Sequence, residues 1–217
     1  MAVKLVKPIN HKKVVKITNQ DFEAKMRELR VNSDIAVAVS GGPDSLALMH
    51  LSNRYALNNN INLTVLSIDH GIRVESSKEI VWLKKVAKKN KINFYSTKLK
   101  KKINSSNTLS KARTLRYEAL SKYCNKKKIK FLLTAHHLDD EIENFLMRLI
   151  RGSGVKGLSS LKVKSRYKNT KLILVRPLLE YSKKSLVAYL SEQKQVYIND
   201  ITNYNNKYCL LYTSDAA

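Results

Sequence analysis

Cysteine is scarce in this chain of 217 residues. Only Cys124 and Cys209 occur, and neither belongs to a CxxC pair. Paired cysteines are the usual sign of a structural metal site or a disulfide framework. The sequence therefore provides neither, and we expect Cys124 to be a small buried hydrophobic residue.

Long hydrophobic runs are also missing. No apolar run approaches the roughly 18–20 residues that a membrane-spanning helix requires, and the N-terminus lacks the apolar segment of a signal peptide. We therefore expect a soluble, cytoplasmic protein with no membrane partner. Hydrophobic residues still make up 43% of the chain, which is enough for the core of one domain, or of one domain and the start of another.

Acidic residues are few compared with basic ones. The chain has 17 Asp and Glu against 41 Lys and Arg, for a formal net charge of +24. A solvated coat of lysines would explain part of this excess. An excess of this size also attracts a polyanion through the release of counterions, so the composition predicts a nucleic-acid partner.

Apolar runs alternate with segments of helical spacing. The runs predict strands at 35–39, 63–68, 93–97, 131–135 and 172–175. The other segments predict helices at 21–30, 46–56, 75–90, 108–127, 139–150 and 182–193. This order is typical of an α/β, Rossmann-like fold: a doubly wound, mostly parallel five-stranded sheet with helices on both faces. Ligands of such folds bind at the carboxyl ends of the strands.

Two of the six glycines stand side by side after the first of these strands, in the segment SGGPDS at residues 40–45. They allow a tight turn that brings backbone N–H groups close to an anion, and the following helix adds its positive end. A Walker loop would end in Lys-Ser or Lys-Thr, whereas this loop ends in Asp44-Ser45. It suits a nucleotide that is cleaved with release of pyrophosphate. A plain Gly-Gly-Pro turn is the alternative.

The second strand is followed by DHGIR at residues 69–73. This segment offers the imidazole of His70, a flexible glycine and the guanidinium of Arg73 at one strand end. These groups could bracket an adenosine and pair with a phosphate. An ordinary polar loop is the alternative.

The densest ionisable cluster is TAHHLDDEIEN at residues 134–144. Asp140 and Glu143 are three residues apart and share a face of the predicted helix, where two carboxylates could hold a magnesium ion or an ammonium group. Helix capping would explain Asp139 alone. The adjacent histidines suggest zinc, but no third ligand follows at a suitable spacing, so we expect no zinc site. Farther along this helix we expect Phe145, Leu146 and Leu149 to lie in the core.

Two basic motifs complete the set. Arg113 and Arg116 lie three apart on a predicted helix, where they could bind phosphate or carboxylate, or form a solvated face. The segment RLIRGSGVKGL begins at Arg148 and continues through Arg151, Gly152, Ser153 and Gly154. It reads as a helix end with Gly152 as its C-cap, leading into a basic loop that could clamp a nucleic-acid backbone or be a simple connection.

The ordered set SGGPDS, DHGIRVESS, ARTLRY, TAHHLDDEIEN, RGSGVKGL, RPLL and NDITN resembles the catalytic domain of the tRNA(Ile)-lysidine synthetases. These enzymes belong to the PP-loop ATP pyrophosphatases, which have the fold of the adenine nucleotide alpha hydrolases. The resemblance extends from about residue 35 to residue 208. Asn144 stands where Thr is more common in that family.

The resemblance implies a ligase that forms a carbon–nitrogen bond. Such an enzyme uses ATP and Mg²⁺ to adenylate C2 of the wobble cytidine in tRNA(Ile) with a CAU anticodon, releasing pyrophosphate. The ε-amine of free L-lysine then attacks C2 and AMP departs. The family also implies a homodimer.

The resemblance further implies roles for individual residues. The ATP site would comprise Ser40, Gly41, Gly42, Pro43, Asp44, Ser45, His70 and Arg73. Asp44 and Glu143 would receive the lysine ammonium, and Arg113 or Arg116 its carboxylate. His136, Asp139 and Asp140 would organise Mg²⁺ and the reacting base, with Asp140 as the metal ligand. Arg148, Arg151, Gly152, Ser153 and Gly154 would contact the tRNA.

Two other functions remain open. A related PP-loop enzyme could deliver sulfur to a tRNA, although such thiolases commonly employ the cysteine pairs that this chain lacks. The chain could instead be a basic RNA-binding module with a decayed nucleotide pocket. The intact SGGPDS segment and the complete acidic cluster argue against decay.

The domain organisation follows from the same resemblance. We expect an N-terminal extension and short helix at 1–30, and the PP-loop catalytic domain at 31–208. Residues 209–217 depart from the family and resemble the translation of a transposon adapter used in sequencing libraries. We therefore expect the native protein to continue beyond Tyr208 into a tRNA-recognition region that this sequence lacks.

Overall fold

A computed structural model describes residues 5–6, 15–69, 76–98, 108–152 and 161–199. Its helices are α1 (Asn19–Glu28), α2 (Pro43–Asn58), α3 (Ser76–Lys89), α4 (Thr108–Lys126), α5 (Leu138–Ile150) and α6 (Lys183–Glu192). Its strands are β1 (Leu5–Val6), β2 (Ile35–Ala38), β3 (Leu63–Asp69), β4 (Asn93–Lys98), β5 (Phe131–Leu133), β6 (Lys164–Arg166), β7 (Ile173–Val175) and β8 (Tyr197–Ile198). All the predicted helices and strands are confirmed, with ends shifted by a few residues.

The main sheet has the strand order β4-β3-β2-β5-β7-β6. The first five of these strands are parallel, and β6 pairs antiparallel with β7 at the edge. The described sheet therefore has six strands where five were predicted. The sixth was missed because β6 is only three residues long and reads Lys-Ser-Arg, a polar composition that suits an exposed sheet edge and carries no hydrophobic pattern.

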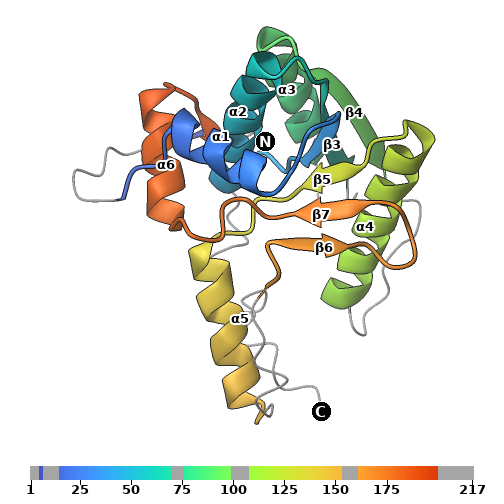
Figure 1. The fold of residues 1–217 in the computed structure, drawn as a ribbon, viewed down its shortest axis with the longest axis vertical. Helices are drawn as coiled ribbons and strands as arrows, with labels where there is room; N and C mark the ends of the chain where they lie inside the picture. The colour runs from blue at the N-terminus through green and yellow to red at the C-terminus, as the bar shows by residue number, and fades with distance from the viewer. Residues whose placement is uncertain (1–4, 7–14, 70–75, 99–107, 153–160, 200–217) are drawn as a thin grey trace.

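Helices cover both faces of this sheet, as predicted (Figure 1). Because successive residues of a strand point to opposite faces, Val37 joins a core cluster with side chains of α1, α2, α3 and α6, whereas Ala36 joins a second cluster with side chains of α4. Cys124 belongs to this second cluster and is fully buried. This burial confirms that Cys124 is a small buried hydrophobic residue, and it raises the pKa of the thiol to about 12.

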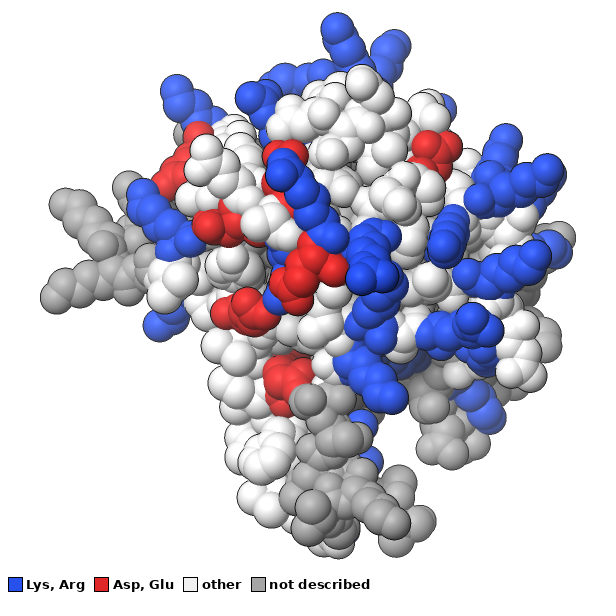
Figure 2. Space-filling view, viewed as in Figure 1, with Lys and Arg blue, Asp and Glu red and all other residues white. Residues whose placement is uncertain are grey.

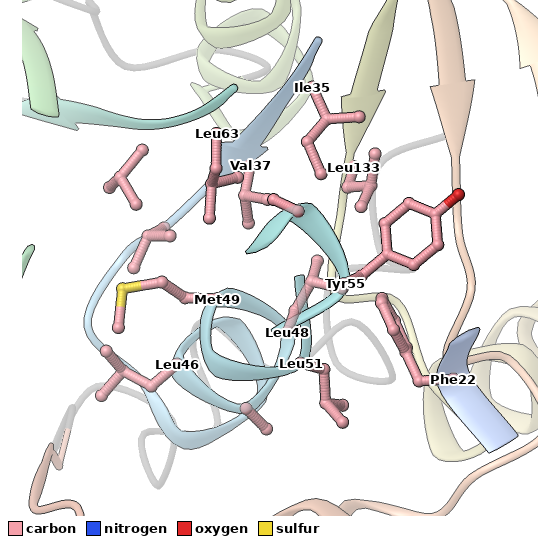
Figure 3. Close-up of a cluster of buried hydrophobic side chains, with 14 of the residues drawn as sticks. Phe22, Ile35, Val37, Leu46, Leu48, Met49, Leu51, Tyr55, Leu63 and Leu133 are labelled. Atoms are coloured by element: carbon pink, nitrogen blue, oxygen red, sulfur yellow. The ribbon is translucent and has the colours of Figure 1, made fainter. Parts of the chain in front are cut away.

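The larger cluster surrounds α2. In Figure 3, side chains of this helix such as Leu48 and Met49 lie close to the β2 and β5 side chains Val37 and Leu133. Full burial of each such side chain stabilises the fold by about 1.5–3 kcal/mol. The helix begins within the SGGPDS segment, with Gly42 as its N-cap and Pro43 as its first residue, where a fixed φ and a missing N–H are favourable. The core therefore holds the start of α2 in place.

Helix α5 differs from the other helices because it extends away from the body of the molecule (Figure 1). Within this fully described helix Met147 is buried, but Phe145, Leu146 and Leu149 are 47%, 41% and 53% exposed. The prediction that these three residues belong to the core is therefore wrong. The helix leaves the edge of the sheet instead of lying across it, so its apolar side has no sheet to cover. Among the described helices, none has both the length and the hydrophobicity needed to cross a bilayer.

Candidate active site

The loop between β2 and α2 is closed by Ser45. Its hydroxyl accepts a hydrogen bond from the backbone N–H of Ser40 at 3.2 Å and donates one to the carbonyl of Gly42 at 3.1 Å. Gly42 is the N-cap of α2 and has no side chain to satisfy the free N–H groups of the first turn. These N–H groups and the helix dipole therefore remain available to an anion.

Gly41 has two independent reasons to be glycine. Its φ of +95° lies in the left-handed region that side chains disfavour, and a Cβ built there would lie 2.5 Å from Cδ1 of Ile198. The carbonyl of Gly41 also accepts a hydrogen bond from the N–H of Ile198 at 2.9 Å. Strand β8, paired with β1, therefore supports the loop from a distant part of the sequence. Nothing in the local sequence around Gly41 or Ile198 indicates this contact.

His137 lies among three carboxylates. Its Nε2 is 3.6 Å from Oδ2 of Asp44 and 3.6 Å from Oδ2 of Asp140, and its Nδ1 is 3.5 Å from Oδ2 of Asp139. Burial by itself lowers the pKa of His137, but the neighbouring carboxylates of Asp44, Asp140 and Asp139 outweigh it, and the pKa is raised. The acidic cluster therefore favours the protonated, cationic form of His137.

The residues of this cluster come from two elements. Asp44 is in the first turn of α2, and Asp139 and Asp140 are in the first turn of α5. Asp140 also accepts a hydrogen bond from the backbone N–H of His137 at 2.9 Å, which is typical of a helix N-terminus. Asp139 accepts one from the N–H of Lys183 at 2.6 Å and so connects α5 to α6.

Two observations leave room for a cationic ligand at the acidic cluster. Oδ1 of Asp44 is buried and has no hydrogen-bond partner among the described residues, a costly state that a ligand would relieve. Glu143, one turn along α5 from Asp140, has a raised pKa because of its burial and the nearby Asp140 carboxylate. A bound ammonium group or metal ion would offset this repulsion.

His136 faces a different set of groups. Its Nδ1 is 2.9 Å from Oγ1 of Thr134, and its Nε2 is 3.2 Å from Nη2 of Arg113. Burial, followed by the charges of Arg113, Arg176 and Arg116, lowers the pKa of His136 to about 3. His136 is therefore neutral at physiological pH and lies in a basic cluster.

Arg176 is the first residue of the RPLL motif and follows a predicted strand, but no individual role was predicted for it. It follows β7, is 8% exposed, and donates to the carbonyl of Lys162 at 2.7 Å and to Oγ of Ser165 at 3.2 Å. Its Nε has no hydrogen-bond partner among the described residues. Its position directly after a strand was the signal that could have identified it. With Arg113 and Arg116, it makes the neighbourhood of His136 strongly cationic.

The predicted site residues fall into three groups. The structure brings together the SGGPDS loop, the acidic residues and the two α4 arginines, in the following set: Ser40, Gly41, Gly42, Pro43, Asp44, Ser45, Arg113, Arg116, His136, Asp139, Asp140 and Glu143. Arg148 and Arg151 lie toward the other end of α5, roughly 12–17 Å along its axis from Asp140 at 1.5 Å per residue. Gly152, with a φ of +65°, directly follows the C-cap Arg151. His70, Arg73, Ser153 and Gly154 lie outside the described residues.

The surface charge is unevenly distributed. In Figure 2, lysines and arginines cover much of the side on which α4 lies, acidic side chains gather near the middle, and the part over α5 is mostly uncharged. Within the described part of the chain, no group of three or more His, Cys, Asp or Glu residues is arranged to hold a metal ion.

A glycine loop with free backbone N–H groups at the start of α2, beside an acidic and a basic cluster at the carboxyl edge of a parallel sheet, is typical of nucleotide-dependent enzymes of the PP-loop class. The sequence matches the PP-loop domain family over residues 11–210, and the chain belongs to this family. Its fold resembles that of the U34-tRNA thiolase NcsA from Methanococcus maripaludis, with a TM-score of 0.67 and 23% identity over 81% of this chain and 64% of that one.

The relatives by sequence have a more specific name. The chain is 46% identical over 176 residues to the tRNA(Ile)-lysidine synthase of Rickettsia bellii strain OSU 85-389, covering 81% of this chain and 40% of that protein. It is 39% identical over 192 residues to the tRNA(Ile)-lysidine synthase of Rickettsia typhi, covering 87% of this chain and 44% of that protein. The chain thus spans less than half the length of these curated relatives.

Proposed function

We propose that the chain performs the ATP-dependent chemistry of a tRNA(Ile)-lysidine synthase. Its substrates would be ATP, free L-lysine and tRNA(Ile) with a CAU anticodon, and the product would carry lysine on C2 of the wobble cytidine. The observation that carries the proposal is the pairing of an acidic and a basic cluster beside the phosphate loop. The sequence similarity to proteins of that name supports it, and the proposed homodimer rests on the family resemblance alone.

The two clusters suit the two ends of a free amino acid. Asp44 and Glu143 offer carboxylates to an ammonium group, and Oδ1 of Asp44 lacks a partner among the described residues. Arg113 and Arg116 offer guanidinium groups to a carboxylate, a pairing that can be bidentate. Lysine carries both charges at neutral pH. A ligand with a single charge would use only one of these clusters.

The loop residues would receive the nucleotide. The free N–H groups of the first turn of α2 would hold the phosphates, and Ser45 would keep the loop closed through its bonds to Ser40 and Gly42. No lysine stands at the end of this loop to neutralise pyrophosphate. Carboxylate oxygens such as those of Asp140 suit Mg²⁺, which needs only one or two protein carboxylates beside substrate phosphates and would supply that missing charge.

The acidic cluster would also bring the nucleophile to the nucleotide. Asp44 belongs to both the phosphate loop and the lysine-binding group, so an amine held there lies next to the place where pyrophosphate leaves. Holding the two reactants together in this way replaces a bimolecular encounter with a local one. The ε-amine must lose a proton before it attacks, and Glu143, whose pKa is raised, is the carboxylate best suited to accept it.

Sulfur transfer is less well supported. Cys124, the one cysteine in the described part of the chain, lies in the core and its thiol pKa is raised to about 12. A buried neutral thiol is a poor nucleophile. The resemblance to a tRNA thiolase at 23% identity concerns the fold alone.

Two assays test the proposed function. A complete protein, which carries this chain and the region expected after Tyr208, is incubated with ATP, Mg²⁺ and a tRNA(Ile) transcript, and ATP–pyrophosphate exchange is measured. Incorporation of labelled lysine into the tRNA is then measured with L-lysine added. We expect exchange that depends on the tRNA, and Asp44→Asn should reduce lysine incorporation roughly 100-fold because it removes a charge-assisted contact. Glu192→Gln, which alters an exposed ion pair with Lys16, is the matched control. Absence of exchange, or unchanged incorporation in Asp44→Asn, would contradict the proposal.

A further inference from the structure

We propose that His136 is a positioning residue, which holds the guanidinium of Arg113 through a neutral imidazole and takes no part in proton transfer. The two histidines of the TAHHLDDEIEN segment thereby have separate tasks. The inference rests on the proposed function only where it assigns the lysine carboxylate to Arg113. The hydrogen bonds that carry it are independent of the substrate.

The hydrogen-bond partners of His136 determine its tautomer. An arginine side chain can only donate hydrogen bonds, so Nε2 of His136 must accept the bond from Nη2 of Arg113 at 3.2 Å. The proton of the neutral ring must then lie on Nδ1, which donates to Oγ1 of Thr134 at 2.9 Å. Thr134 is itself buried, and its backbone N–H is bonded to the carbonyl of Val175. Thr134 is therefore held in place by the sheet, and it holds His136, which in turn holds Arg113.

The surroundings of His136 preserve this tautomer. Helix α4 contributes Arg113 and Arg116, the segment after β7 contributes Arg176, and the N-cap of α5 contributes His137. All of these groups are cationic or become so on protonation, and no ion pair connects His136 to a carboxylate in the described part of the chain. A second proton on His136 would place an N–H against the Arg113 guanidinium and break the bond. The lowered pKa of about 3 is consistent with this arrangement.

Among the described residues, Arg113 has one other recorded contact. It lies on an exposed part of α4, with its Cζ 5.6 Å from the centroid of the Tyr117 ring. A free arginine side chain has about 2 kcal/mol of rotamer entropy to lose when it binds a ligand. The bond to His136 restricts the guanidinium before the ligand arrives, so less of this entropy is lost on binding. His136 should therefore influence how tightly the carboxylate is bound and leave the rate of the chemical step unchanged.

Two other roles fit these contacts poorly. A general base needs a free lone pair and a pKa near the working pH, whereas the Nε2 lone pair of His136 is occupied by Arg113. A metal ligand at Nε2 would have to displace Arg113 and would bring a cation into a basic cluster. Both roles suit the carboxylate-rich surroundings of His137 and Glu143 better.

The first test compares two variants of His136 in the lysine-incorporation assay. His136→Gln keeps an acceptor oxygen near the position of Nε2, and His136→Leu removes it. We expect His136→Leu to raise the KM for lysine roughly 10-fold, the loss of one hydrogen bond to a charged group, and His136→Gln to restore most of it. The kcat at saturating lysine, the KM for ATP and the pH profile of kcat should remain those of the wild type. His50→Leu, a partly buried histidine bonded to Gln195, serves as the control.

A double-mutant cycle sharpens the test. Arg113→Ala should raise the KM for lysine at least as much as His136→Leu, and the double variant should add little to Arg113→Ala because His136 acts through Arg113. A kcat that falls at least 100-fold in both His136→Gln and His136→Leu, with loss of an ionisation near pH 6–7, would overturn the inference in favour of a general base. Additive effects in the cycle would overturn it as well.

A second measurement does not depend on activity. Nitrogen-15 NMR of the imidazole rings should show His136 neutral at pH 7 with its proton on Nδ1, and Arg113→Ala should change the Nε2 signal of His136 more than that of His137. A proton on Nε2, or an Nε2 signal that does not respond to Arg113→Ala, would overturn the inference. If this pattern appears and lysine is not incorporated, the positioning contact stands and the proposed function fails.

Discussion

His136 and His137 are neighbours in the sequence and have opposite electrostatic surroundings. His136 faces arginines, and its pKa is lowered to about 3, whereas His137 faces carboxylates, and its pKa is raised. The backbone of His137 is extended, with φ of −130° and ψ of −179°, and successive side chains of an extended segment point to opposite sides. One histidine therefore faces Arg113 of α4, and the other faces Asp44 of α2. The edge of the sheet separates a basic half-site from an acidic one.

One short segment can in this way present opposite surroundings to the two ends of the proposed substrate. Segment 134–140 begins directly after β5, at the carboxyl edge of the sheet, where ligands of such folds bind. Helix α4 lies on one face of the sheet, and α2 and α6 lie on the other. Side chains that point to opposite sides of the segment therefore contact different helices. The charges carried by those layers then determine what each histidine can do.

Removing a carboxylate from the acidic half should have the largest effect. Asp140→Asn is expected to lower lysine incorporation roughly 10- to 100-fold, the loss of a hydrogen bond or ion pair to a charged ligand, and to lower the pKa of His137. The Asn side chain can still accept the N–H of His137, so the helix start is retained. Lysine-incorporation kinetics and proton NMR titration of the histidines measure the two effects. An unchanged pKa of His137 would show that the acidic half does not control it.

Stability should depend on pH in opposite directions for the two histidines. The pKa of His137 is higher in the folded chain than its value of about 6.5 in the unfolded chain. Its positive charge therefore stabilises the fold fully below pH 6.5, and this stabilisation is lost as pH rises through the pKa of the folded state. His137→Asn, which keeps an N-cap side chain, should lower the free energy of unfolding by about 1–3 kcal/mol at pH 6 and by less at pH 9. Urea unfolding at both pH values measures this difference.

His136→Gln is the matched comparison for that experiment. The pKa of His136 is about 3 in the folded chain and about 6.5 in the unfolded chain. As pH falls from about 6.5 toward 3, His136 therefore binds a proton in the unfolded state and stays neutral in the folded state. The wild type therefore loses stability over this range, and the variant should gain stability relative to it between pH 7 and pH 4. Parallel pH dependences for His136→Gln and His137→Asn would refute the contrast between the half-sites.

The outermost carboxylate should matter least. The Asp139 side chain is 53% exposed, compared with 23% for Asp44, and solvent screens an exposed charge. Asp139→Asn should lower the pKa of His137 less than Asp140→Asn does, and should change the free energy of unfolding by at most about 1 kcal/mol, since an amide oxygen can still accept the Lys183 N–H. NMR titration of the histidines and urea unfolding of the two variants show which carboxylate has the larger effect on the pKa of His137 and on stability. A larger effect at Asp139 would place the centre of the acidic half nearer α6.

Much of the fold was predictable because its signals are local. Apolar runs such as 35–39 and 131–135 are buried on both faces of a parallel sheet, and the glycines after the first run show where a ligand approaches the backbone. Elements without such a signal were missed: β6 is short and polar, and the β1–β8 pair has two residues per strand. The exposed side of α5 was misjudged because an apolar helical pattern does not show whether a partner is present.

The candidate site shows the same division. The SGGPDS loop, the acidic residues and the arginines of α4 could be selected from the sequence, because their chemistry is evident from residue type and spacing. Ile198 carried no such signal, and Arg176 carried only that of a charged residue directly after a strand. Ile198 acts through its backbone N–H on Gly41, and the importance of Arg176 comes from its burial beside residues more than 30 positions away in the sequence.

By itself, the sequence determined the α/β class, the position of the phosphate loop and the supply of opposite charges at the strand ends, because these depend on local patterns. Only the tertiary structure decided which charges meet. It placed Asp44 beside His137 and Arg113 beside His136, since helix α2 packs on one face of the sheet and α4 on the other. Electrostatic interactions depend on distance through space and on burial, and neither quantity can be obtained from the order of the residues alone.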